Sequence, residues 1–313
     1  MSPPTVSAVL PAWNAARWVG RAVRSALAQT LPPCEVIVAD DGSTDGTAQA
    51  AAITPQIRVL RLPHRGQAAT TNAAIREARG EWVAILHADD EWLPEKTAVQ
   101  LAALPRLPEA GVIYSDLMLV SPAGDEIGRF LPGKAHAAEG WVFDALIEQC
   151  FVLPSSALIR RSLFAQEGLS FPEDLEVALD YELWLRAARR HRFLRVEAPL
   201  VRRTLLPGAA STRDAALHQD HVVLMRRLRE RLIADEGAAA RALPRLAARL
   251  GRAEFIHGLD RYRGGDVAGA RRELAQSLRH HPSAAAVAWW LLALMGRPGR
   301  AVALGRRRSR RTP

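Results

Sequence analysis

Two adjacent carboxylates, Asp89 and Asp90, follow a short apolar run in the first third of the chain. The run Val83–Leu86 is typical of a strand buried on both faces, and His87 stands two residues before the first carboxylate. Ligands of open α/β sheets collect beyond the carboxyl ends of strands. Paired carboxylates there suit a hard divalent cation, which would in turn hold a diphosphate. The competing interpretation is that both acids only cap the turn before Pro94.

Two other acidic segments have similar alternatives. Residues 40–47, DDGSTDGT, combine turn residues with helix-capping Ser, Thr and Asp, so at least one of Asp40 and Asp41 is expected to serve the turn. Asp180 stands just before apolar positions with helical spacing, which is the position of a helix cap. A carboxylate at such a place can also act as a general base, taking a proton from an attacking hydroxyl.

The elements that must position these groups alternate between strands and helices. Strands are expected at Thr5–Leu10, Glu35–Ala39, Ile57–Leu62 and Val83–Leu86, with helices near residues 18–31, 47–52 and 67–78 between them. This alternation predicts an α/β fold with a doubly wound, mostly parallel sheet flanked by helices. Because no GxGxxG follows the first strand and no GxxxxGKS occurs, neither a Rossmann dinucleotide site nor a P-loop is expected.

The last third of the chain has a different composition. Residues 226–313 contain 20 Arg, no Lys and seven acidic residues, and their net charge of +13 leaves −4 for residues 1–225. A uniformly basic nucleic-acid binder would not show this asymmetry, and no nucleic-acid partner is expected. We therefore predict two domains, residues 1–212 and residues 213–313, the second an all-α region.

Within the all-α region, residues 249–282 resemble one tetratricopeptide-like helical hairpin, and Pro244 and Gly251 are expected to break the helices. The following segment Ala284–Met295 is apolar all round, so it is expected to be buried, self-associating or laid on a membrane. The tail ends in an Arg-rich run, residues 306–311. A basic tail beside an apolar helix favours contact with anionic lipid or a charged lipid-linked acceptor, although a solvated tail without a partner is an equal alternative.

Four blocks of sequence occur in order: PAWNAARW, VIVADDGSTDGT, HRGQAATTNAAIREARGEWVAILHADDEWLP and LDYELWLRAARRH. Together they resemble the inverting glycosyltransferases of family 2, which have the GT-A fold. The resemblance covers about residues 4–205. Such an enzyme needs a slot for a nucleotide-sugar donor, a clamp for its diphosphate and an open face toward an acceptor.

The resemblance implies donor contacts at Pro11, Ala12, Trp13, Asn14, Asp41, Arg65, Gly66, Asn72, His87, Asp89 and Asp90. The Trp13 ring would stack on the base, and Asp41 would accept a hydrogen bond from a ring N–H of the base. Asp89 and Asp90 match the metal-binding element of the family and would hold Mn²⁺ or Mg²⁺. His87 stands where many members have Asp, and it suits Mn²⁺ better than Mg²⁺.

The resemblance also assigns Asp180 as the general base, with Glu182 as the fallback. Leu179 replaces a Glu that often precedes the base, and Thr71 stands where many relatives carry a basic residue. Arg202 and Arg203 follow the last expected strand. Their side chains are expected either to contact the diphosphate or to be exposed to solvent.

The expected activity is transfer of a sugar from a nucleotide-diphosphate sugar, with a UDP-sugar favoured, to a hydroxyl of a glycan, lipid-linked or other acceptor. The alternatives are a nucleotidyltransferase that makes a nucleotide sugar and an inactive, transferase-like interaction protein. Two widely separated cysteines and a start without a basic, apolar leader favour a cytoplasmic protein. A peripheral position on the inner face of the membrane is compatible with the basic C-terminus.

Overall fold

The computed structural model describes residues 4–131, 138–206, 214–233 and 239–296. The expected boundary between residues 212 and 213 and the Arg-rich tail lie outside the described residues. The chain divides into two compact units: Met1–Leu175 with Leu179–Ala209, and Glu176–Ala178 with Ala210–Pro313.

Nine described strands of the first unit form one sheet in the order β3-β2-β1-β4-β8-β6-β9-β5, with β7 paired to β6. Their bounds are β1 Val6–Ala12, β2 Glu35–Asp40, β3 Ile57–Arg61, β4 Trp82–Ile85, β5 Asp90–Trp92, β6 Ala110–Val120, β7 Glu126–Arg129, β8 Ala157–Arg160 and β9 Arg192–Thr204. The first four strands along the chain pair in parallel, and β6 pairs in parallel with β9. The pairs β4–β8, β6–β8, β6–β7 and β5–β9 are antiparallel.

The α/β class with flanking helices is thus confirmed, while the expected mostly parallel sheet is parallel in its first half and mixed beyond it. The parallel half follows the apolar runs of the sequence, since β1 and β4 are buried along their whole lengths.

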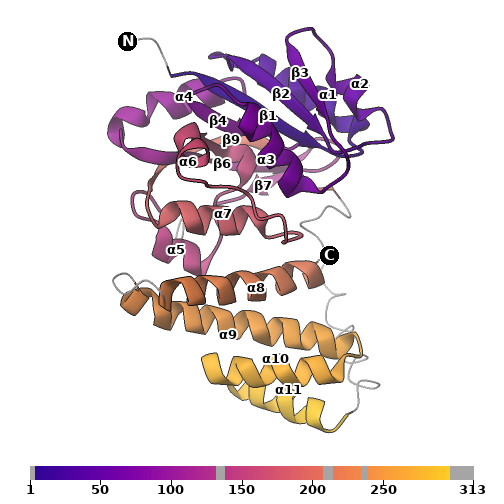
Figure 1. The fold of residues 1–313 in the computed structure, drawn as a ribbon, viewed down its shortest axis with the longest axis vertical. Coiled ribbons are helices and arrows are strands. Elements are labelled where there is room, and N and C mark those ends of the chain that lie inside the picture. Colours follow the sequence, from indigo (N-terminus) through magenta and orange to yellow (C-terminus); the bar gives the residue numbers. More distant parts are fainter. Residues whose placement is uncertain (1–3, 132–137, 207–213, 234–238, 297–313) are drawn as a thin grey trace. The chain divides into compact units, whose positions relative to one another are not determined.

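The helices of this unit are α1 Ala16–Leu27, α2 Thr47–Ala51, α3 Gln67–Glu77, α4 Lys96–Ala102, α5 Phe143–Glu148, α6 Arg161–Ala165 and α7 Leu179–Ala188, with short 3₁₀ turns at Leu104–Arg106 and Pro154–Ser156. Helices α1 and α3 both pack on β1 (Figure 1). The buried side of α1 carries Val19, Ala22, Val23 and Ala26, which recur at helical spacing and meet the core of the sheet.

The second unit contains the helices α8 Asp214–Ile233, α9 Ala239–Arg263, α10 Val267–His280 and α11 Ala284–Leu294. The breaks expected at Pro244 and Gly251 are wrong, because α9 runs through both positions. Pro244 lies near the start of the helix, where it removes a single backbone hydrogen bond. Gly251 allows a close approach, since a Cβ there would collide with the backbone and Cβ of His281.

Helix α11 exposes most of its apolar side chains. Only Ala286 and Ala293 are buried among its described residues, whereas Val287, Leu291, Leu292 and Leu294 are exposed. Among the described residues, no helix combines the length and the hydropathy required to cross a bilayer.

Candidate functional site

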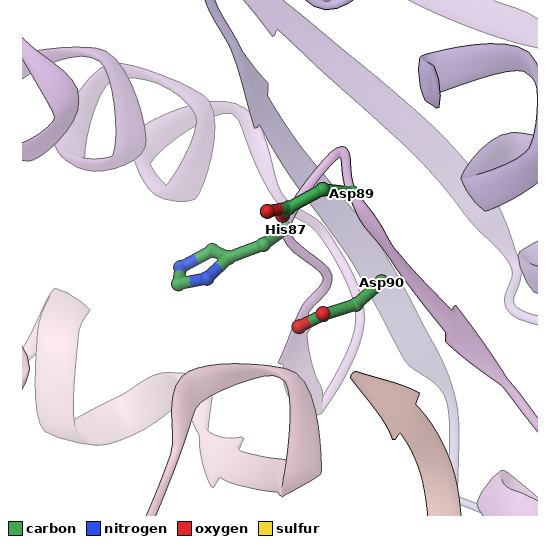
Figure 2. A group of neighbouring side chains, drawn as sticks. All are labelled: His87, Asp89 and Asp90. Atoms are coloured by element: carbon green, nitrogen blue, oxygen red, sulfur yellow. The ribbon is translucent and has the colours of Figure 1, made fainter. Parts of the chain in front are cut away.

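His87, Asp89 and Asp90 lie together just beyond the carboxyl end of β4. Each offers one ligand atom, and these atoms lie within 4.8 Å of one another. The three side chains point to the same side of the turn that leads from β4 into β5 (Figure 2). An imidazole nitrogen with two carboxylates fits Mn²⁺, and it fits Mg²⁺ less well because Mg²⁺ prefers oxygen ligands.

The backbone of this turn explains why the three groups converge. The amide of Asp90 donates to the carbonyl of His87 at 3.0 Å, which closes the turn. Asp90 then begins β5 and pairs with Arg203 of β9. Its side chain accepts a 2.6 Å hydrogen bond from the Ser155 hydroxyl. The described hydrogen bonds of Asp90 therefore place it in a strand instead of at the cap of the next helix.

Burial controls the protonation of the cluster. Burial, with a smaller contribution from the charge of Asp89, raises the pKa of Asp90 to about 7. Burial also lowers the pKa of His87, so its imidazole is neutral at neutral pH and has a lone pair to offer. A cation placed here would favour ionised Asp90 and offset the repulsion between the two carboxylates.

The end of β1 presents an exposed aromatic ring. Trp13 is 53% exposed and stacks on His64, with ring centroids 4.8 Å apart. At this exposure Trp13 does not belong to the hydrophobic core. Asn14 has a left-handed backbone with φ 47°, and its side chain accepts from the amide of Thr44 at 3.1 Å. Pro11 and Ala12 end β1, and the loop with Trp13 and Asn14 that follows them is tied to the segment after β2.

Asp40 and Asp41 have different hydrogen-bond partners. Asp40 accepts from the amide of Ser43 at 3.1 Å and serves the turn. The buried Asp41 carboxylate accepts from the amides of Arg65 and Gly66 at 2.8 and 3.0 Å. It also accepts from the hydroxyl of Thr70 at 2.7 Å and lies 2.9 Å from the His64 ring. Asp41 thus holds the loop that starts α3, and its contact with a base stays a prediction.

The remaining predicted donor residues on this side have different surroundings. The Arg65 side chain is exposed and lies 3.8 Å from a carboxylate oxygen of Glu173. Gly66 has φ 92°, a left-handed conformation that favours glycine. Asn72 is buried, and both ends of its amide bond the backbone of Phe171, each at 2.9 Å. These hydrogen bonds show that Asn72 holds the segment before α7 in place.

Asp180 is the second residue of α7, so it is not the helix cap that the simpler interpretation expected. Its carboxylate is partly exposed and accepts from the amide of Tyr181 at 2.9 Å. Burial raises its pKa to about 6. A carboxylate with this pKa is ionised at neutral pH and is a better proton acceptor than an ordinary aspartate. Glu182 is 4% exposed and lies deeper in the core.

Arg203 of β9 pairs with Asp90 of β5 in the sheet, which the sequence alone did not settle. Its positive charge acts to lower the pKa of both Asp90 and Asp180. Arg202, its neighbour in β9, donates instead to the carbonyl of Gly124 and pairs with Glu126 at 3.3 Å. Neighbouring side chains in a strand point to opposite faces, so strand alternation was the signal that could have separated the two arginines.

Comparison with known proteins identifies the family. The model of the family described as Glycosyl transferase family 2 matches residues 7–118. An uncharacterized glycosyltransferase of Rickettsia prowazekii is 30% identical over 224 residues, 69% of this chain and 68% of that protein. The succinoglycan biosynthesis protein ExoO of Rhizobium meliloti is 32% identical over 192 residues, 58% of this chain and 54% of that protein. The match to an uncharacterized glycosyltransferase of Rickettsia felis covers 59% of this chain but 30% of the relative's length.

Solved structures share the fold. TarS 1–349 from S. aureus in complex with UDP-GlcNAc aligns with a TM-score of 0.69 and 20% identity, over 92% of this chain and 90% of that chain. A mannosyltransferase, PcManGT from Pyrobaculum calidifontis, in complex with GDP-Man and Mn²⁺, aligns with a TM-score of 0.60 and 22% identity, over 94% and 80%. At these identities the likeness shows the fold alone. The sequence match across more than two thirds of a relative's length shows the family, and the chain belongs to glycosyl transferase family 2.

Proposed function

We propose that this protein is an inverting glycosyltransferase that moves a sugar from a nucleotide-diphosphate sugar to an acceptor hydroxyl. A UDP-sugar is favoured as donor, and the acceptor is a hydroxyl of a glycan, lipid-linked or other molecule. Relatives named for polysaccharide biosynthesis and a neighbour in complex with UDP-GlcNAc support this class of substrates. The observation that carries the proposal is the His87–Asp89–Asp90 cluster, which shares the neighbouring charge of Arg203 with Asp180.

The donor half of the mechanism uses the residues around β1 and β4. Trp13 stacks on the base, while His87, Asp89 and Asp90 hold a divalent cation, Mn²⁺ or Mg²⁺. When bound, the cation supplies positive charge that stabilises the departing nucleoside diphosphate. PcManGT, a neighbour of the same fold in complex with GDP-Man and Mn²⁺, supports the use of a metal here. The Arg203 guanidinium adds a second positive charge on the same side.

The acceptor half depends on Asp180. As the acceptor oxygen forms its bond to the anomeric carbon, the bond from that carbon to the diphosphate oxygen breaks. The proton of the acceptor hydroxyl passes to a carboxylate oxygen of Asp180, and the electron pair of the breaking bond leaves with the nucleoside diphosphate. A single displacement of this kind inverts the anomeric configuration. Arg203 and the helix N-terminus favour the ionised carboxylate before the transfer.

A donor screen tests this assignment. UDP-, GDP- and dTDP-sugars are incubated with the protein and Mn²⁺, and the products are separated. We expect slow, metal-dependent release of the nucleoside diphosphate from one of them. Release of pyrophosphate from a nucleoside triphosphate and a sugar phosphate would instead identify a nucleotidyltransferase. Absence of binding to every donor would favour an inactive interaction protein.

The rate of transfer is expected to depend on pH through Asp180. Because its pKa is raised to about 6, the carboxylate is protonated below that pH and cannot accept the hydroxyl proton. The maximal rate should fall about tenfold for each pH unit well below the pKa and level off above it. The measurement is kcat against pH at saturating donor, acceptor and Mn²⁺. A flat profile between about pH 5 and 8 would contradict the assignment of Asp180.

We also propose that the protein is cytoplasmic and touches the inner face of the membrane through its C-terminal part. Helix α11 contains no charged residue and exposes Leu291 and Leu294 to 49% and 45%. The sequence after it, residues 297–313, contains seven Arg and no acidic residue. Apolar surface and a polybasic segment are the two signals that together hold a protein at an anionic bilayer.

Removing residues 297–313 is expected to leave donor hydrolysis unchanged and to weaken binding to anionic vesicles by more than tenfold. Each arginine near such a surface contributes about 1 kcal/mol, so the loss of even two or three contacts is sufficient. Sedimentation with vesicles of phosphatidylglycerol and phosphatidylcholine measures the binding. Leu291→Gln, an exposed change in α11, tests the apolar contribution. Equal vesicle binding by the full chain and both variants would leave a solvated tail as the correct interpretation.

A further inference from the structure

Ser155 contacts two members of the His87–Asp89–Asp90 cluster at the same time. Its hydroxyl donates to Oδ2 of Asp90 at 2.6 Å and accepts from the backbone amide of His87 at 3.1 Å. Ser155 is 1% exposed. One hydroxyl can make both bonds because it has a single proton to give and lone pairs to receive. Ser155 therefore spans the turn that carries the cluster.

The backbone around Ser155 is held by hydrogen bonds from two buried side chains. The Nε1–H of Trp92 donates to the carbonyl of Ser155 at 2.9 Å, and the amide side chain of Gln100 donates to the carbonyl of Ser156 at 2.7 Å. Trp92 is the last residue of β5, and Gln100 lies in the buried face of α4. The 3₁₀ turn Pro154–Ser156 is thus held by two buried side chains that do not belong to the cluster. Because the backbone of this turn is held, the Ser155 hydroxyl meets the cluster from a fixed position.

We infer that Ser155 is a positioning residue for the divalent cation, an inference that rests on the proposed metal-dependent function. Its hydroxyl donates to Oδ2 of the Asp90 carboxylate, which also accepts a backbone hydrogen bond from Thr204. These bonds fix the rotamer of Asp90, and an ionised carboxylate has about four lone-pair sites, enough to bind a cation as well. The same hydroxyl accepts from the backbone amide of His87 and so fixes the first residue of the turn, whose last residue is Asp90. Groups that orient metal ligands in this manner commonly change metal affinity 10–100-fold when they are removed.

A purely structural role for Ser155 makes a different prediction. In that case the hydroxyl would only satisfy buried polar groups, and its removal would lower stability without a specific effect on metal binding. The chain supplies a matched control in Ser156, which is also 1% exposed. Its hydroxyl donates to the carbonyl of Leu153 at 2.8 Å, and no described hydrogen bond joins it to the cluster.

The experiment compares Ser155→Ala with Ser156→Ala in the full chain. Binding of UDP, GDP and dTDP is titrated calorimetrically with and without Mn²⁺, and free Mn²⁺ is followed by its paramagnetic resonance signal. We expect Ser155→Ala to lose roughly 10–100-fold in Mn²⁺ affinity. Metal-independent nucleotide binding should stay unchanged, and the change in Tm should be similar in the two variants. Ser155→Cys, which retains the size of the side chain but donates weakly, should fall between wild type and Ser155→Ala.

Equal Mn²⁺ affinity in wild type and Ser155→Ala would overturn the positioning role while leaving the metal site in place. An equal loss in Ser156→Ala would overturn it as well, because the effect would then come from a general loosening of the turn. If the wild-type protein itself bound no Mn²⁺ with any of the three nucleotides, the proposed metal-dependent function would fail together with this inference.

Discussion

Asp89→Asn is expected to fold normally and to lose Mn²⁺-dependent binding of the nucleoside diphosphate. Asp89 is partly exposed within a group of three ligand atoms that lie within 4.8 Å of one another. Asparagine preserves the volume but removes the charge, which is the property a hard divalent cation requires. The loss should exceed the 10–100-fold typical of residues that only orient metal ligands. Calorimetric titration of UDP with and without Mn²⁺ measures it.

Asp90→Asn is expected to cause the same loss, since it removes the second carboxylate of the cluster. Glu91→Gln is the matched control, because Glu91 lies between Asp90 and Trp92 in β5 and pairs with Arg21 at 3.0 Å, outside the cluster. It removes one negative charge from the same segment and should leave the metal dependence intact. Unchanged Mn²⁺-dependent affinity in both asparagine variants would contradict the metal site.

The parts of the fold that the sequence predicted are those with a local signal. The wholly apolar run Val83–Leu86 marked β4, and the acids after it lie beyond its carboxyl end as expected. The periodic positions of α1 marked its buried face. In each case a few neighbouring residues contain the whole pattern, so one sequence suffices to read it.

The parts that could not be predicted depend on contacts between distant segments. Strand β5 has three residues, two of them acidic, and forms only because β9 pairs with it. Ser155 reaches Asp90 across 65 residues of sequence. Asp41 lies in a segment with strong turn chemistry, yet its partners come from the loop before α3. No spacing rule relates such residues, because tertiary packing alone brings them together.

Asp180→Asn is expected to lower the rate of transfer by about 10²-fold or more at saturating substrates. A sugar hydroxyl is a very weak acid and attacks effectively only if its proton is removed as the new bond forms. Asparagine cannot accept that proton. Donor affinity should change little, because the predicted donor contacts lie on other elements, around β1 and β4. Turnover with a working acceptor, measured beside nucleotide affinity, separates the two effects.

The melting temperature of Asp180→Asn relative to wild type provides a second test, because the raised pKa of Asp180 predicts the direction of the difference. The pKa of Asp180 is about 6 in the folded protein against an ordinary value of 3.8. The folded state therefore holds the proton more tightly, and this residue's contribution to stability falls as pH rises from about 4 to 6. Asparagine has no charge to bury, and its oxygen can still accept from the amide of Tyr181. The variant is expected to melt at a higher temperature than wild type at about pH 8, with the difference disappearing near pH 4.

Glu182→Gln is the control that makes these outcomes decisive. Glu182 also lies in the first turn of α7, but it is 4% exposed and therefore less accessible to an acceptor hydroxyl. Asp180 is identified as the base if Asp180→Asn is slow but binds the donor normally, while Glu182→Gln stays active. Loss of a proton acceptor lowers the rate of transfer without changing donor affinity. If Asp180→Asn instead turned over at the wild-type rate, the assignment would fail and Glu182 would be the next candidate. If it lost donor binding as well, Asp180 would belong to the donor site, since a base that acts only on the acceptor contributes nothing to the affinity of the nucleotide.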